Sequence, residues 1–145
     1  MSKREEKEAP KRSIAMATHF DRELLAHLAR RERIRIEMQA GDRAHLSRLM
    51  FVIHHDHLYI RSARRDNAPW YQTLRANPQA TLHVGRLHLP IRAVAVQDEQ
   101  TRKRVGEHFV QKYVYLHPSS TRTMLYEQVA ETTFRLEPAG VETPV

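Results

Sequence analysis

The segment Leu58–Gly85 constrains the fold most, because it places two short apolar runs on either side of a basic loop and a short polar stretch. Tyr59 and Ile60 supply the aromatic and β-branched side chains typical of a strand, and Thr81–Val84 forms the second apolar run. Four residues that can bind an anion crowd the loop between them, namely Arg61, Ser62, Arg64 and Arg65. The order predicts a strand, a basic loop, a helix and a second strand.

The helix in this segment is predicted from its two ends. Asp66 or Asn67 can cap its start, and Pro69 is tolerated in the first turn, where a missing N–H is not needed. Asn77-Pro78 ends it, because proline pushes the preceding residue out of helical geometry. The N-terminus of a helix attracts anions through its free N–H groups and its dipole. We therefore predict that the basic loop and the helix start together form a phosphate-binding cradle.

The rest of the chain alternates between strand-like and helix-like patterns. Apolar residues recur at helical spacing over Thr18–Arg31, Asp98–Tyr113 and Ser119–Gln128. A hairpin turn is predicted at His55-Asp56, and Pro90 indicates an edge or a bulge because it lacks a ladder donor. The predicted strands are Arg33–Met38, Arg48–His54, Leu58–Ser62, Thr81–Val84, Leu87–Val96 and Glu131–Glu137. This pattern favours a closed or nearly closed antiparallel barrel with helices packed outside.

Length and composition narrow the class of protein. The 145 residues suffice for one domain with a core, which we expect over residues 13–138, between a disordered tail of mixed charge at 1–12 and a flexible tail at 139–145. The chain has no cysteine, which excludes disulfides, thiolate metal sites and a cysteine nucleophile. Its apolar runs are too short to cross a membrane, and its start lacks the apolar segment of a secretory signal. We expect a cytoplasmic protein.

The formal net charge of +7 favours an anionic partner. Nucleic acid, acidic lipid and a phosphorylated small molecule all meet that description. Small barrels that bind nucleic acid use exposed aromatic side chains on which bases stack, and here the aromatic residues fall mostly at predicted core positions. A phosphorylated small molecule is therefore the favoured partner.

The motifs of the same segment resemble those of the deazaflavin-dependent nitroreductases. The resemblance rests on Ser62, Pro69-Trp70-Tyr71, Ala76-Asn77-Pro78 and Val84-Gly85, and it extends from Ile34 to Pro138. An uncharacterised bacterial group that carries Tyr-x-Arg-Ser before Trp-Tyr is closer still to Tyr59–Ser62. Both groups are members of the flavin-binding split β-barrel superfamily, together with the pyridoxamine phosphate oxidases.

This resemblance implies a fold, a function and a set of site residues. The fold would be a split β-barrel, mainly β with peripheral helices, of the type seen in FMN-binding proteins and pyridoxamine phosphate oxidases. The function would be that of a flavin- or deazaflavin-binding, oxidoreductase-like protein, forming a homodimer with the flavin at the subunit interface. The candidate cofactor-binding residues are Arg61, Ser62, Arg64, Arg65, Trp70 and Tyr71, and Tyr113 is the candidate proton donor.

The cofactor stays open at this stage. The nitroreductases carry a Gly-Arg-x-Ser-Gly turn before their second strand, whereas Gly41–Arg48 keeps one glycine and two arginines without the Ser-Gly pair. FMN, a deazaflavin, another phosphorylated ligand and no cofactor at all are all compatible with the sequence. The alternative function is a non-enzymatic barrel module that binds another anionic ligand, haem or nucleic acid.

The run His54–His57 is the densest group of potential metal ligands. Neighbouring residues of a strand point to opposite faces, so adjacent histidines do not easily share one ion. We expect exposed imidazoles at a hairpin tip and no metal site.

Overall fold

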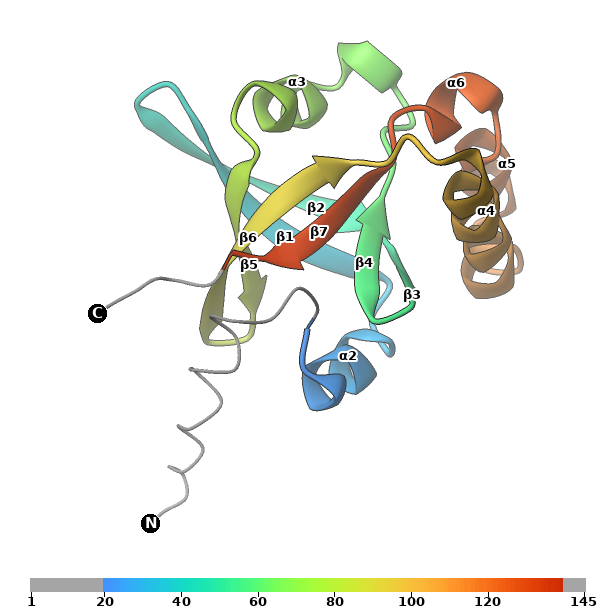
Figure 1. The fold of residues 1–145 in the computed structure, drawn as a ribbon, viewed down its shortest axis with the longest axis horizontal. Coiled ribbons are helices and arrows are strands. Elements are labelled where there is room, and N and C mark those ends of the chain that lie inside the picture. The colour runs from blue at the N-terminus through green and yellow to red at the C-terminus, as the bar shows by residue number, and fades with distance from the viewer. Residues whose placement is uncertain (1–19, 140–145) are drawn as a thin grey trace.

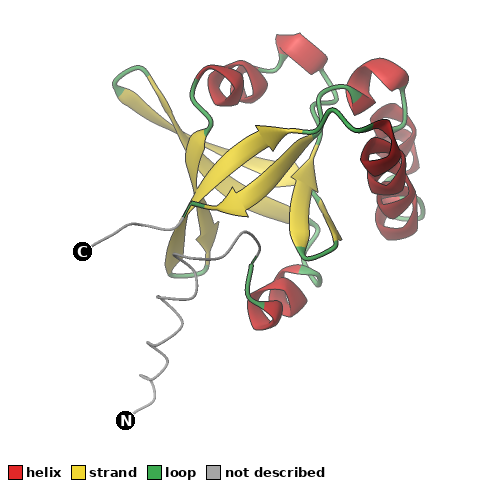
Figure 2. Ribbon diagram, viewed as in Figure 1, coloured by secondary structure: helices red, strands yellow, loops and turns green. Residues whose placement is uncertain are grey.

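A computed structural model describes residues 20–139 of the chain. The two predicted tails therefore lie outside the described residues, apart from Ala139. The described part is a strongly curled sheet with helices around its outside (Figures 1 and 2). Its elements are α2 (Arg22–Leu28), β1 (Arg33–Ala40), β2 (Arg43–Met50), β3 (Val52–His54), β4 (His57–Ile60), the 3-10 turn η1 (Arg65–Asn67), α3 (Pro69–Ala76), β5 (Gln79–Val84), β6 (Leu87–Ala95), α4 (Glu99–Tyr113), α5 (Pro118–Met124), α6 (Glu127–Ala130) and β7 (Phe134–Pro138).

The seven strands form one antiparallel sheet in the order β2-β1-β5-β6-β7-β4-β3. Strands β2 and β3 stand at opposite ends of this order, yet only Phe51 separates them along the chain. One residue cannot cross a flat sheet whose strands lie about 4.8 Å apart. The sheet must therefore curl until its two edges meet at Phe51, and this confirms the predicted split barrel with peripheral helices.

Several predicted boundaries were wrong. The predicted strand Arg48–His54 is two strands, because the chain leaves one edge of the sheet at Phe51 and joins the other. The predicted helix Ser119–Gln128 is divided into α5 and α6 by a turn in which the Leu125 N–H donates to the Arg122 carbonyl. The last strand begins only at Phe134, since the two preceding threonines bond back to the end of α6. The first helix is confined to α2.

Pro90 lies inside the sheet and not on an edge strand, which corrects the prediction in part. Strand β6 has β5 and β7 as neighbours, but its pairing with β7 begins only at Ile91. The Pro90 carbonyl accepts a hydrogen bond from the Ala139 N–H at 2.9 Å, at the point where β7 ends. In a strand, the N and O of one residue point to the same neighbour, so the missing N–H of Pro90 faces the side where the ladder has ended.

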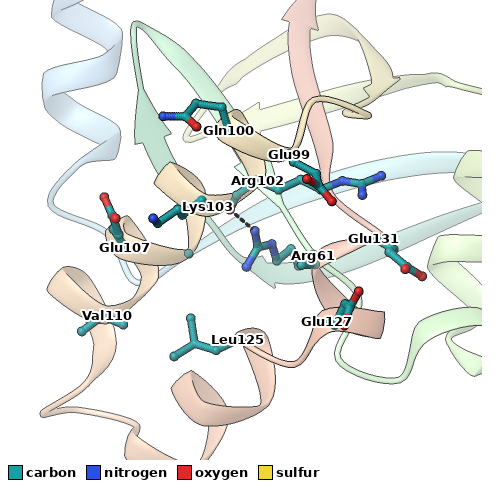
Figure 3. Close-up of a pocket in the computed structure, with 12 residues that line it drawn as sticks. Arg61, Glu99, Gln100, Arg102, Lys103, Glu107, Val110, Leu125, Glu127 and Glu131 are labelled. Carbon is teal, nitrogen blue, oxygen red and sulfur yellow. Dashed lines mark hydrogen bonds between the residues drawn. The ribbon is translucent and has the colours of Figure 1, made fainter.

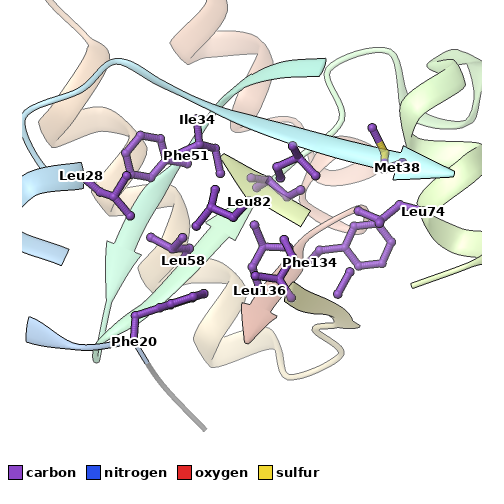
Figure 4. Close-up of a cluster of buried hydrophobic side chains, with 14 of the residues drawn as sticks. Phe20, Leu28, Ile34, Met38, Phe51, Leu58, Leu74, Leu82, Phe134 and Leu136 are labelled. Carbon is purple, nitrogen blue, oxygen red and sulfur yellow. The ribbon is translucent and has the colours of Figure 1, made fainter. Parts of the chain in front are cut away.

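The core has two parts because β4 is buried on both faces. Leu58 and Ile60 belong to the main cluster inside the barrel, in which Figure 4 labels Leu58. Tyr59 belongs to a second cluster, together with Val105 and Phe109 of α4. This second cluster joins the outer face of the β3–β4 hairpin to the helices; its members are Met50, Val52, Tyr59, Val96, Val105, Phe109, Tyr113, Met124 and Val129.

Phe51 needs partners from outside the sheet because it belongs to no strand and is fully buried. The Tyr113 hydroxyl accepts a hydrogen bond from the Phe51 N–H at 3.0 Å, and its own proton lies within reach of the carbonyls of Glu32 at 2.6 Å and Phe51 at 2.8 Å. The Lys112 ammonium donates to the Phe51 carbonyl at 3.3 Å and lies 3.5 Å from the centre of the Phe51 ring. The end of α4 thus stabilises the corner of the barrel.

We expect the stability of the protein to rise with pH because of Lys112. Burial lowers the pKa of Lys112 from 10.5 to about 8, although the Glu32 carboxylate opposes that shift. Below about pH 8 the lysine is protonated in both states, and between the two pKa values the unfolded chain binds more protons. The free energy of unfolding should therefore increase across this window in the wild type, and not in Lys112→Met, when both are unfolded in urea. An equal increase in both proteins would contradict this role of Lys112.

Candidate functional site

The strand alternation of β4 continues into the loop and sends Arg61 away from the other loop residues. Its side chain points outward with Tyr59 toward α4 and is only 3% exposed. The Arg61 guanidinium donates to Thr133 Oγ1 at 2.8 Å and to two backbone carbonyls, those of Met124 at 2.8 Å and Arg102 at 2.5 Å. Arg61 therefore connects the end of β4 to the helical segments by hydrogen bonds, and its guanidinium does not lie with those of Arg64 and Arg65.

Ser62 shapes the loop from within. Its N–H donates to Thr132 Oγ1 at 2.8 Å, and its hydroxyl donates to the Arg65 carbonyl at 2.9 Å. Arg65 has a φ of 54°, a left-handed conformation that costs a non-glycine residue about 1 kcal/mol or more. The same Arg65 carbonyl also accepts from the Ala68 N–H at 3.3 Å. These bonds hold the strained turn in one shape, and the Ser62 hydroxyl proton is used inside the loop.

The fixed turn displays two arginines to solvent. Arg64 and Arg65 are both exposed, and no carboxylate or carbonyl within residues 20–139 accepts a hydrogen bond from either guanidinium. Arg75, by contrast, is paired with Asp66 at 3.2 Å. A guanidinium presents a planar fork of donors that matches the oxygens of a phosphate or carboxylate. Arg64 and Arg65 are therefore the cations of this loop that are available to an anion.

The start of the following helix differs from the prediction. Residues Arg65–Asn67 form the 3-10 turn, and Ala68 is the N-cap without a side-chain bond, so neither Asp66 nor Asn67 caps the helix. Pro69 does stand in the first turn, as expected. The Tyr71 and Gln72 N–H groups already bond to the Ala68 carbonyl. The Trp70 N–H is thus the one first-turn amide without a backbone partner in the described chain, and the helix adds little to an anion site.

A cavity of about 570 Å³ opens beside this loop. Tyr71 forms one wall; it packs against Phe134, with ring centres 5.4 Å apart, and burial raises the pKa of its hydroxyl. Trp70 meets Tyr71 edge-on at 5.9 Å and packs against the main core. The cavity is lined by Arg65, Asp66, Asn67, Tyr71, Arg75, Gln128, Glu131 and Thr132.

The cavity is lined mostly by polar side chains and has one aromatic wall, Tyr71. Its volume lies within the range of about 300–1,000 Å³ found for small-molecule sites. Because Asp66 and Arg75 neutralise each other, Arg65 is the lining cation without a paired acid, and Arg64 precedes it on the same turn. Glu131 also lines the cavity and contributes a negative charge. The residues present therefore fit a phosphate held at the loop and a ring system held near Tyr71.

Four lining residues were missed by sequence reasoning, namely Arg75, Gln128, Glu131 and Thr132. Arg75 could have been found, since it follows Tyr71 by four residues on a helix and its guanidinium lies 5.6 Å from the centre of the Tyr71 ring. Thr132 comes from the far end of the chain, and only the pairing of β4 with β7 brings it to the loop. No local pattern indicates that contact.

Tyr113 does not line this cavity and belongs instead to the second core cluster. It is fully buried, and its hydroxyl is taken up by the backbone of Phe51 and Glu32. Burial raises its pKa to about 12. The geometry is that of a tyrosine that holds the corner of the barrel.

The histidines gather at the β3–β4 hairpin, whose turn residues His55 and Asp56 have φ values of 51° and 65°. The predicted hairpin at this position is confirmed. His54 Nδ1 lies 3.0 Å from His108 Nε2 of α4, and the His54 ring stacks on His55 at 3.9 Å. Across the described residues, no three metal-binding side chains come together. The imidazole pair connects the hairpin to α4.

Comparison with known proteins gives one family. A family model described as an uncharacterized protein conserved in bacteria (DUF2255) matches residues 24–136. No curated protein matches the chain. In residues 20–139, no helix is long and apolar enough to cross a membrane.

Solved structures share the fold at low sequence identity. HutZ, the haem storage protein of Vibrio cholerae, has a TM-score of 0.60 and 15% identity, with 83% of this chain and 90% of that chain covered. A putative pyridoxamine 5'-phosphate oxidase from Listeria innocua has a TM-score of 0.57, 16% identity and coverages of 83% and 93%. An F420-H2 dependent reductase has a TM-score of 0.55, 17% identity and coverages of 74% and 94%. The resemblance to the split-barrel superfamily is confirmed as a likeness of fold.

Proposed function

Since the chain belongs to the DUF2255 family and has the split-barrel fold, we propose that it binds the phosphate of a flavin-type cofactor, FMN or a deazaflavin, at Arg64 and Arg65. One observation carries this proposal: two solvent-facing arginines without an acidic partner stand on a strained turn that buried hydrogen bonds hold in place. Such pre-ordering lowers the entropy lost when a ligand binds.

The side chains of the loop and of the cavity would have different roles in binding. Arg64 and Arg65 would hold the phosphate, Ser62 and Thr132 would keep the turn in shape, and Tyr71 with Trp70 would flank the ring or its chain. When bound, a flavin-type cofactor supplies hydride or electron transfer, which makes an oxidoreductase-like activity the favoured function. The protein contributes anchoring, orientation and exclusion of water.

We also propose that the protein acts as a homodimer. Leu46 on β2 and Leu87 at the start of β6 are 45% and 53% exposed, although both stand on strands of the sheet. Exposed apolar side chains on strands are favourable places for a second subunit to pack.

Haem binding by a non-enzymatic barrel is the second candidate, because one structural relative is described as a haem storage protein. Haem iron needs an axial ligand, commonly an imidazole. None of the residues that line the 570 Å³ cavity is a histidine. The flavin-type ligand is therefore the better fit to this cavity.

The test is whether the purified protein carries or accepts such a cofactor. We expect a flavin-like absorption band, with a phosphorylated flavin or deazaflavin in the released extract by mass spectrometry, or a rise in melting temperature when FMN or a deazaflavin is added. A ligand at 100 times its Kd stabilises by about 2.7 kcal/mol, which a melting curve resolves. Riboflavin, which lacks the phosphate, should raise the melting temperature less. A colourless protein that neither cofactor stabilises would contradict the proposal.

A further inference from the structure

A second cavity, of about 660 Å³, lies between α4 and the segment that contains α5 and α6 (Figure 3). Arg61, Leu125, Glu127 and Glu131 line it (Figure 3), together with Gly106, which lies next to Arg61 and Leu125. The side chains that line this cavity differ from those that line the proposed cofactor site, except for Glu131, which lines both cavities.

The charge of Arg61 is buried without a carboxylate partner. No salt bridge joins it to an acid of the described chain, and its three hydrogen bonds go to neutral oxygens. A buried cation is ordinarily paired, because removal from water is costly without an opposite charge. Burial, together with the nearby Arg102, lowers the pKa of Arg61 to about 10. The cation thus lacks the anion that such a position normally has.

Arg61 also has unused donors. A guanidinium has five N–H groups, one on Nε and two on each terminal nitrogen. Each of the three nitrogens uses one N–H group: Nε donates to Thr133 Oγ1, Nη1 to the Met124 carbonyl and Nη2 to the Arg102 carbonyl. One N–H on each terminal nitrogen is left without a partner among residues 20–139. Two such donors on one planar group are the arrangement that a carboxylate binds with both oxygens.

Gly106 places no side chain against this guanidinium. It lies in the interior of α4, where glycine is less stable than alanine by about 1 kcal/mol. A Cβ at Gly106 would lie 3.4 Å from Leu125 Cδ2 and 3.5 Å from Arg61 Nη1, which are ordinary contacts. Packing therefore tolerates alanine at this position. The missing side chain leaves open the space directly beside Arg61.

The remaining lining residues select the kind of anion. Val110, Leu125 and Ala130 give the cavity apolar lining. The four carboxylates of Glu99, Glu107, Glu127 and Glu131 outnumber the other two lining cations, Arg102 and Lys103, and so disfavour a second negative charge. We propose that this cavity binds a small organic monocarboxylate, with its carboxylate on Arg61 and its apolar body against Leu125. A phosphate ester, with up to two negative charges, fits the cavity less well. The inference does not depend on the flavin proposal.

Calorimetric titration of the full chain tests this site with butyrate and benzoate as ligands. We expect both to bind in the millimolar range, and inorganic phosphate and butylamine to bind at least ten times more weakly. Gly106→Leu, which fills the space beside Arg61, should weaken butyrate and benzoate binding at least tenfold. Gln111→Leu adds the same side chain to an exposed position of α4 outside the cavity, and should leave their binding unchanged.

Gly106→Ala provides a variant that packing permits, in case the leucine disturbs the fold. It should melt at or above the wild-type temperature and still bind butyrate more weakly, because its methyl group lies where a carboxylate oxygen would approach Nη1. The proposal is overturned if the wild type binds neither carboxylate, or if phosphate binds as tightly as butyrate. Unchanged butyrate affinity in a folded Gly106 variant would overturn it as well.

Discussion

Tyr113→Phe is expected to lower the free energy of unfolding by about 2–3 kcal/mol, near the upper end of the range for a buried polar group left without a partner. The substitution removes one oxygen and leaves the ring in place, so no large cavity forms. The Phe51 N–H, however, loses the acceptor that lies 3.0 Å away, and it stands in a fully buried position outside any strand. The Glu32 carbonyl loses its donor at 2.6 Å. Phe51 and Tyr113 are both 0% exposed, so water does not readily replace the hydroxyl at the Phe51 N–H.

Urea denaturation followed by circular dichroism measures this loss. Tyr115→Phe is the matched control, because Tyr115 is 95% exposed two residues further along the chain and its hydroxyl makes no hydrogen bond within residues 20–139. We expect Tyr115→Phe to change stability by less than about 0.5 kcal/mol, as surface substitutions usually do. If the two variants were equally stable, Tyr113 would not hold the corner between β2 and β3.

The alternation of apolar and polar residues predicted most of the barrel. The strand that contains Leu58 and Ile60 was predicted correctly, and the hairpin at His55-Asp56 was placed correctly. The corner at Phe51 could not be predicted in the same way. The residues on both sides of it continue a strand-like pattern, and the break arises from closure of the barrel, which is a property of the whole sheet.

The candidate site was predicted less completely than the fold. The composition of the loop indicated an anion site, but the alternation that continues from β4 separates Arg61 from Arg64 and Arg65, which composition alone does not show. The Ser62 hydroxyl is used to shape the turn, and the partner of its N–H, Thr132, is seventy residues away along the chain. Contacts of this range depend on strand order, and a local pattern carries no information about them.

The central claim is that Arg64 and Arg65 hold the cofactor phosphate, and a double variant tests it most directly. Arg64→Ala with Arg65→Ala should weaken binding of FMN, or of the deazaflavin if that is the ligand, by about 100-fold or more, since each charged hydrogen bond contributes about 1.5–3 kcal/mol. The fold should be unaffected, because neither guanidinium contacts another described residue. Riboflavin, without a phosphate, should bind the variant and the wild type equally.

The control is a second double variant with the same net charge, in which the two arginines are removed from a different part of the surface. Arg43→Ala with Arg86→Ala removes two exposed arginines from hairpin ends, so both double variants fall from a formal net charge of +7 to +5, that is, 7 − 2. Fluorescence titration of the three proteins with the cofactor is the decisive measurement. The account predicts wild-type affinity for the Arg43/Arg86 variant and a loss of about 100-fold for the Arg64/Arg65 variant. Equal affinity in all three proteins would contradict it.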